Sequence, residues 1–82
     1  MFSVKELDLI GVVSPVCLLK CKRVLSEMSA GETLDILLQD PDVVEELVKI
    51  IDRSADKVIQ TAQERDHYRI RLIKGETFNG GS

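Results

Sequence analysis

Hydrophobic and polar residues along this chain follow two different periods, and the changes between them delimit six segments. Residues 4–10, 33–39, 57–64 and 67–74 alternate with a period of two, which is typical of strands. Residues 15–28 and 41–53 place apolar side chains three and four positions apart, which is typical of helices with one packed face. The pattern therefore predicts the order βαβαββ.

Each helical segment begins with the same pair of signals. Ser14-Pro15 and Asp40-Pro41 both place an N-cap type of residue before a proline, which tolerates the first helical position because it has no N–H to lose. The order βαβαββ with two short crossover helices predicts an α/β two-layer sandwich with a four-stranded mixed sheet. A tight turn at Arg65-Asp66 is expected to join the last two strands as a hairpin.

Composition narrows the class of protein. The 82 residues are enough for one domain, which we place at residues 1–75, followed by a polar, glycine-rich tail at 76–82. A net charge of −3 argues against a nucleic-acid binder, which would carry a basic surplus. No run is long enough for a membrane span and no signal-peptide pattern is present, so we expect a cytoplasmic protein with reduced cysteines.

The segment between the first strand and the first helix is the richest in chemical signals. Gly11 allows a sharp turn out of the strand, Ser14 is expected at the N-cap, and Pro15 at the first helical position. Such a corner directs free N–H groups and the positive end of the helix dipole at one point. A negatively charged group at that point would be stabilised, yet the residue there is a serine.

Residues around this corner identify a family. The relevant segments are Leu7-Asp8-Leu9-Ile10-Gly11, Ser14-Pro15, the helix 18–25, the strand entry 31–36, Asp40-Pro41 and the closing strand 68–74. In this order and spacing, the chain from Leu7 to Lys74 resembles the TusA/SirA-like family of small sulfur-carrier proteins. In those proteins the first strand is followed by the motif Gly-x-x-Cys-Pro-x-Pro and a helix. A second strand, the pair Asp-Pro, a second helix and two final strands come next. The resemblance implies that both helices lie on one face of the sheet.

The faces of the sheet follow from this arrangement and from the alternation of the strands. The residues expected to face the helices are Leu34, Ile36, Leu38, Tyr68, Ile70 and Leu72. Those expected to face water are Asp35, Leu37, Ile59, Thr61, Arg69, Arg71 and Ile73. The aliphatic residues among the latter fit either a partner surface or the scattered apolar residues that any small protein exposes.

The chain departs from the family in its functional motif. The family cysteine corresponds to Ser14 and the second proline of the motif to Cys17, so that Cys-Pro-x-Pro becomes Ser14-Pro15-Val16-Cys17. The resemblance implies sulfurtransferase or persulfide-carrier activity without a bound cofactor, together with protein partners such as a cysteine desulfurase and a downstream sulfur acceptor. A serine hydroxyl does not ionise near neutral pH and forms no persulfide, so transfer through position 14 should be absent.

Two cysteines remain as candidate thiols. Cys17 is expected at the third helical position, where it is either a relocated sulfur-accepting thiol under the influence of the helix dipole or a buried core residue. Cys21 lies one turn further along the apolar stripe and is expected to be buried. No metal site is expected, because the only histidine and the carboxylates complete no ligand spacing with these cysteines.

The first helix also carries a basic face. Lys20, Lys22 and Arg23 follow the corner, where they would either steer an acidic partner protein or form an ordinary solvated face. The sequence thus favours a sulfur-carrier-related protein that has diverged at the sulfur-accepting cysteine. Such a protein would serve sulfur or redox metabolism through partner proteins, with Cys17 as the candidate carrier. The alternative is a non-catalytic interaction or regulatory module that uses the same fold.

Overall fold

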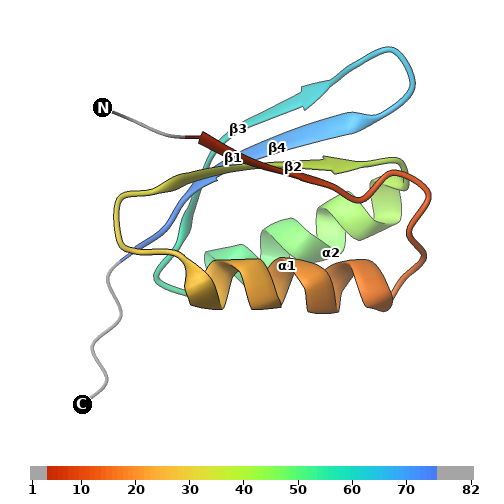
Figure 1. The fold of residues 1–82 in the computed structure, drawn as a ribbon. Coiled ribbons are helices and arrows are strands. Elements are labelled where there is room, and N and C mark those ends of the chain that lie inside the picture. Colours follow the sequence, from red (N-terminus) through yellow and green to blue (C-terminus); the bar gives the residue numbers. More distant parts are fainter. Residues whose placement is uncertain (1–3, 76–82) are drawn as a thin grey trace.

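The fold follows the predicted order of elements (Figure 1). A computed structural model describes residues 4–75. Its elements are β1 (Val4–Asp8), α1 (Val16–Glu27), β2 (Thr33–Leu38), α2 (Pro41–Asp52), β3 (Lys57–Gln63) and β4 (Tyr68–Ile73). The predicted tail at 76–82 lies outside the described residues, so the domain boundary stays a prediction. Among the described residues, no helix has the length and apolar character that crossing a membrane requires.

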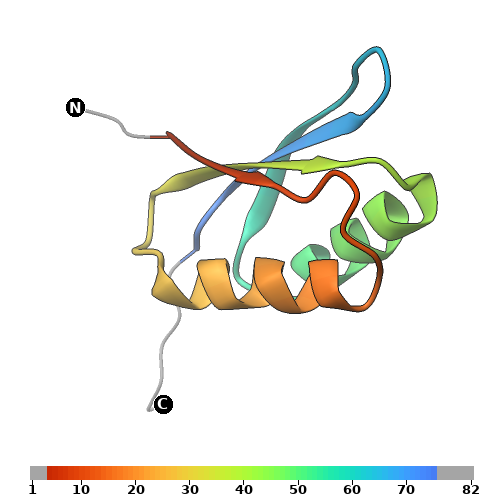
Figure 2. The same ribbon diagram turned by 45° about the vertical axis from the view of Figure 1, so that its right-hand side comes forward.

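The four strands form one mixed sheet in the order β1-β2-β4-β3. β1 pairs with β2 in parallel, whereas β4 is antiparallel to both of its neighbours, β2 and β3. Both helices lie on the same face of this sheet, as two views 45° apart show (Figures 1 and 2). The prediction of a two-layer α/β sandwich is therefore confirmed.

Each helix buries a stripe that its sequence period creates. α2 buries Val43, Leu47 and Ile51, which recur every fourth residue. α1 buries Cys17 and Cys21 in the same way, while Leu18 and Leu25 pack against the core only in part. The core between the layers is completed by side chains of the two central strands, Leu34, Ile36, Leu38, Ile70 and Leu72, all at most 2% exposed.

The predicted alternation is wrong at one strand. Thr61 was expected to face water on the outer side, and it is exposed, but it pairs with Ile70, which faces the helices. Thr61 therefore lies on the helix side of the sheet, at its edge strand β3. The cause is a register irregularity in β3 between Val58 and Gln60, which inserts an extra residue and shifts the alternation that follows. Ile59, at this irregularity, is 52% exposed, as expected.

The outer face of the sheet is also less solvated than predicted. Asp35 and Leu37 were expected to face water, yet they are only 3% and 7% exposed. The reason is the register with β4, which sets Arg71 opposite Asp35 and Arg69 opposite Leu37. Their long side chains cover the strand beneath them.

Asp35 is the centre of a charged network on this face. Its carboxylate accepts hydrogen bonds from Arg71 Nε at 2.7 Å, Arg71 Nη2 at 2.9 Å and Arg69 Nη1 at 2.9 Å. Hydrogen bonding from Arg71, more than any other contact, holds the pKa of Asp35 below its ordinary value. Arg69 also binds Glu6 on β1 and Glu64 in the turn between β3 and β4. One network therefore links β1, β2, β4 and this turn.

Candidate functional site

The corner between β1 and α1 begins with a turn whose backbone conformation favours glycine. Gly11 has a φ of +83°, a left-handed conformation that residues with a Cβ rarely adopt. The turn is closed by the Val12 N–H, which donates to the Leu9 carbonyl oxygen at 3.0 Å. The Asp8 carboxylate accepts from the Ile10 N–H at 3.0 Å and so ends the strand. The predicted role of Gly11 is confirmed.

The start of α1 differs from the prediction. Pro15, not Ser14, is the N-cap residue, the helix begins at Val16, and no side chain makes a capping hydrogen bond. The Cys17 N–H, which an N-cap hydroxyl would have satisfied, instead donates to the Val13 carbonyl oxygen at 3.2 Å. The assignments of Ser14 as N-cap and Pro15 as first helical residue are therefore wrong by one position. The Ser14–Pro15 peptide bond is cis.

α2 begins as predicted. Asp40 is the N-cap, its carboxylate accepts the Asp42 N–H at 2.9 Å, and Pro41 is the first helical residue. Because β1 and β2 are parallel, their carboxyl ends lie at the same edge of the sheet. The two strand-to-helix corners, with Ser14 on one and Asp40 on the other, therefore meet at this edge.

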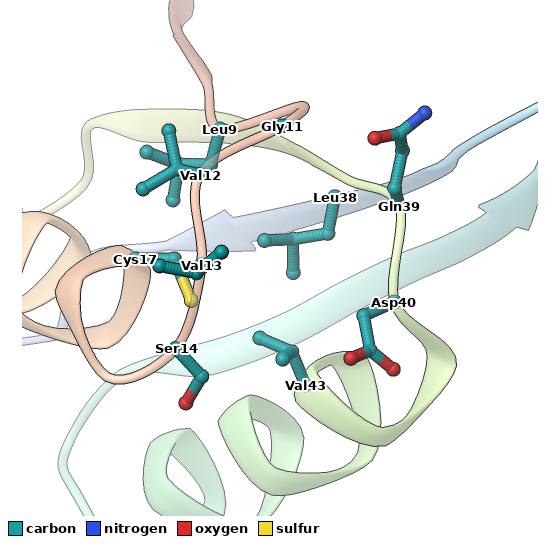
Figure 3. Close-up of a pocket in the computed structure, with 10 residues that line it drawn as sticks. All are labelled: Leu9, Gly11, Val12, Val13, Ser14, Cys17, Leu38, Gln39, Asp40 and Val43. Carbon is teal, nitrogen blue, oxygen red and sulfur yellow. The ribbon is translucent and has the colours of Figure 1, made fainter.

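Between these corners lies a cavity of about 390 Å³ (Figure 3). Its walls come from the β1–α1 corner, from the end of β2 and from the start of α2, with Ser14 and Asp40 on different sides. Sequence reasoning missed Val13, Gln39 and Val43 in this lining. The parallel pairing of β1 and β2 would have indicated Gln39, since it directly follows β2.

The two candidate positions for sulfur chemistry have opposite environments. Ser14 is exposed at the cavity rim, and it is the residue that the sequence motif led us to expect in place of the family cysteine. Cys17 is the second residue of α1 rather than the predicted third, and it is only 1% exposed. Its sulfur borders the inner wall of the same cavity (Figure 3). The site thus brings Ser14 and Cys17 together, but it leaves no thiol at the surface.

Cys21 is still less available. It is 1% exposed, and burial, with a smaller contribution from neighbouring Cys17, raises its pKa to about 12. Since the thiolate is the reactive form, this shift in pKa lowers the reactivity of Cys21 at neutral pH. Within residues 4–75, no three His, Cys, Asp or Glu side chains are grouped closely enough to hold a metal ion.

The basic residues of α1 do not enter the cavity. Lys20, Lys22 and Arg23 are all exposed on the helix, and Arg23 pairs with Glu27 at 3.9 Å. Exposed pairs of this kind contribute about 0.3–0.5 kcal/mol. Lys22 lines a separate groove between α1 and α2. Sequence proximity thus places these residues beside the corner but not in it.

Comparisons with known proteins agree on one assignment. The family model described as sulfurtransferase TusA matches residues 5–74. A putative sulfur carrier protein of Methanocaldococcus jannaschii is 26% identical over 74 residues, which are 90% of this chain and 99% of that protein. The sulfur carrier protein TusA of Allochromatium vinosum is 26% identical over 70 residues, 85% of this chain and 92% of that protein.

The fold is shared with a solved structure. The crystal structure of a SirA-like protein from Desulfitobacterium hafniense superposes with a TM-score of 0.76 at 18% identity, over 90% of this chain and all of that one. The order of elements, the two parallel-strand corners and the family match over 5–74 lead to one conclusion. This chain belongs to the TusA family of sulfur-carrier proteins.

Proposed function

We propose that this protein serves sulfur metabolism as a docking module, which binds the partner proteins of sulfur carriers but accepts no sulfur at the family position. The single observation that carries this proposal is the absence of an exposed thiol among residues 4–75. Both cysteines are 1% exposed, and the exposed corner position holds Ser14. A persulfide carrier needs an exposed, ionised thiol to attack the donor and to present the sulfur to the acceptor.

The surface around the corner supports docking. Val13 is 72% exposed beside Ser14, and Gln39 and Asp40 are exposed across the cavity. An apolar side chain next to polar groups at the rim of a cavity suits recognition by another protein. A partner protein that binds this corner in other family members would therefore still bind the corner of this protein, although the thiol is absent.

Cys17 remains a second candidate for sulfur transfer. It is supported by its place in the lining of the same cavity as Ser14. For Cys17 to accept sulfur, the segment 11–14 would have to move away from the cavity and expose the Cys17 sulfur. The docking proposal requires no such movement.

A sulfur-uptake assay separates the two candidates. A cysteine desulfurase and cysteine are supplied, and sulfur uptake is read by mass spectrometry as a gain of about 32 Da per persulfide formed on an activated thiol. We expect the wild type to take up no sulfur and Ser14→Cys to gain one adduct. Uptake by the wild type that is lost in Cys17→Ala would instead establish Cys17 as the carrier.

Docking itself is tested by competition. Unlabelled wild-type protein, added in excess, should slow sulfur uptake by Ser14→Cys, because both bind the same surface of the desulfurase. The variant Val13→Asp should lose this inhibition, since it places a charge in the proposed contact. Val4→Asp is the matched control, because Val4 is also exposed, at 51%, but lies on the edge strand β1. The docking proposal fails if the wild type does not inhibit, or if both variants inhibit equally.

A further inference from the structure

The helical layer carries an apolar groove on its solvent side, separate from the cavity at Ser14. The groove has a volume of about 490 Å³ and runs between α1 and α2. Its apolar lining includes Leu18, Leu19 and Leu25 from α1, with Leu47 and Ile50 from α2. Leu19 is 63% exposed and Ile50 is 44% exposed. Two large aliphatic side chains are thus held in water on either side of one groove, although burying each would be favourable.

The two helices that border the groove have opposite charges. Within its bounds, α1 carries three basic residues and one acidic residue, namely Lys20, Lys22, Arg23 and Glu27. α2 carries four acidic residues and one basic residue, namely Asp42, Glu45, Glu46, Asp52 and Lys49. The salt bridges on these helices lie within one helix, Arg23 with Glu27 and Lys49 with Glu45. In the described part of the chain, no ion pair joins α1 to α2, so each wall keeps its own charge.

From this pattern we infer that the groove is covered by a second copy of the chain. α1 and α2 lie side by side, and both start at the edge where β1 and β2 end, so they run in the same direction (Figure 1). A two-fold axis that runs between the helices and along them lays α1 of each copy over α2 of the other. The basic helix then meets the acidic helix twice, and Leu19 and Ile50 are buried between the layers.

The alternative two-fold arrangement is disfavoured by charge. An axis perpendicular to the helices would lay α1 over α1 and α2 over α2, which brings like charges together. In an isologous interface every contact occurs twice, so the repulsion would also be doubled. The charges therefore select one orientation of the dimer, as electrostatic complementarity does in other interfaces. This inference is independent of the proposed docking function, because it uses the helical face and not the corner.

The mass of the protein in solution tests this arrangement. Light scattering coupled to size exclusion should give twice the 9.2 kDa chain mass as the protein concentration rises. The double variants Lys22→Glu/Arg23→Glu and Glu45→Lys/Glu46→Lys should each be monomeric. Each variant gives α1 and α2 of both copies the same sign of charge, so the facing helices repel each other. An equimolar mixture of the two variants should recover the dimer mass, since opposite walls then face each other again.

The controls keep the test specific. Lys5→Glu/Lys57→Glu changes the net charge by the same amount as Lys22→Glu/Arg23→Glu, but on exposed strand residues, and should still dimerise. Leu19→Ser should weaken the dimer without any change of charge, and circular dichroism should show that all variants are folded. The inference is overturned if the wild type stays monomeric, which would leave the groove to a different partner protein. It is equally overturned if the charge variants dimerise on their own, or if their mixture stays monomeric.

Discussion

The buried carboxylate of Asp35 should be a major contributor to the stability of this domain, and Asp35→Asn tests that. The substitution keeps the shape of the side chain but removes the charge that faces Arg69 and Arg71. Three hydrogen bonds of 2.7 to 2.9 Å end on this carboxylate, which is 4% exposed. A hydrogen bond to a charged group contributes about 1.5–3 kcal/mol.

The expected loss is smaller than three such bonds, because the arginines keep access to water. Their side chains are 29% and 39% exposed, and Arg69 also retains Glu6 and Glu64. Removing one partner of a fully buried pair costs about 3–5 kcal/mol. With both cations partly hydrated, we expect Asp35→Asn to lower the free energy of unfolding by about 2–3 kcal/mol.

Denaturation in urea at pH 7 measures this difference, and its pH dependence identifies the cause. Hydrogen bonding from Arg71 lowers the pKa of Asp35 from 3.8, so its charge stabilises the folded state fully above that pH. The contribution is lost as the pH falls through the folded-state pKa. The gap between wild type and Asp35→Asn should therefore close in strong acid.

Glu6→Gln is the matched control, because Glu6 binds the same Arg69 at 3.1 Å but is 54% exposed. It should change the unfolding free energy by less than about 1 kcal/mol. If Asp35→Asn costs no more than Glu6→Gln, or if the gap does not narrow as the pH falls below 3.8, the network does not stabilise the fold in the way described.

Two further predictions address the corner and the thiols. Asp40→Ala should lower the free energy of unfolding by about 1 kcal/mol, because it removes a capping hydrogen bond. Ser14→Ala should lower it by less than about 0.5 kcal/mol, because Ser14 makes no such bond. Chemical denaturation measures both differences. Equal losses of unfolding free energy would indicate that Ser14 caps the helix after all. Cys21, with a pKa of about 12, should react with iodoacetamide at pH 7 at least about 10³-fold more slowly in the folded protein than in urea. A fast-reacting cysteine in the folded wild type would contradict the burial of both thiols.

The sequence predicted the architecture because local signals and long-range packing agree there. The four alternating segments and the stripe of Val43, Leu47 and Ile51 are signals that depend on neighbouring residues only, and they correspond to the four strands and to the buried face of α2. The irregularity in β3 could not be predicted, because it changes which residues of β3 and β4 pair, and the sequence of β3 by itself carries no signal of that pairing. The burial of Asp35 was missed for a related reason, since it depends on which residues β4 places opposite β2.

At the functional corner, similar sequence signals produce different structures. Asp40-Pro41 forms a capped start, with Asp40 in an extended conformation (φ −92°, ψ 117°) that points its carboxylate at the helix. Ser14-Pro15 does not, because Pro15 itself takes the N-cap place (φ −91°, ψ 6°) and the Val13 carbonyl receives the Cys17 N–H. A preference for a cap residue cannot distinguish these cases, since the conformation of the preceding turn decides between them.

The residues that define the chemistry of this corner contribute little to holding the domain together. Ser14, Gln39 and Asp40 are exposed and follow the ends of β1 and β2, outside the strand ladders, whereas the buried apolar side chains lie in the layer between helices and sheet. Of the three, only Asp40 makes a capping bond. We therefore expect a mutation at position 14 to leave the protein folded, and under the proposed function such a mutation changes sulfur uptake alone. In evolutionary terms, such a scaffold can lose its original chemistry in a single step and persist, folded, long enough to acquire another role.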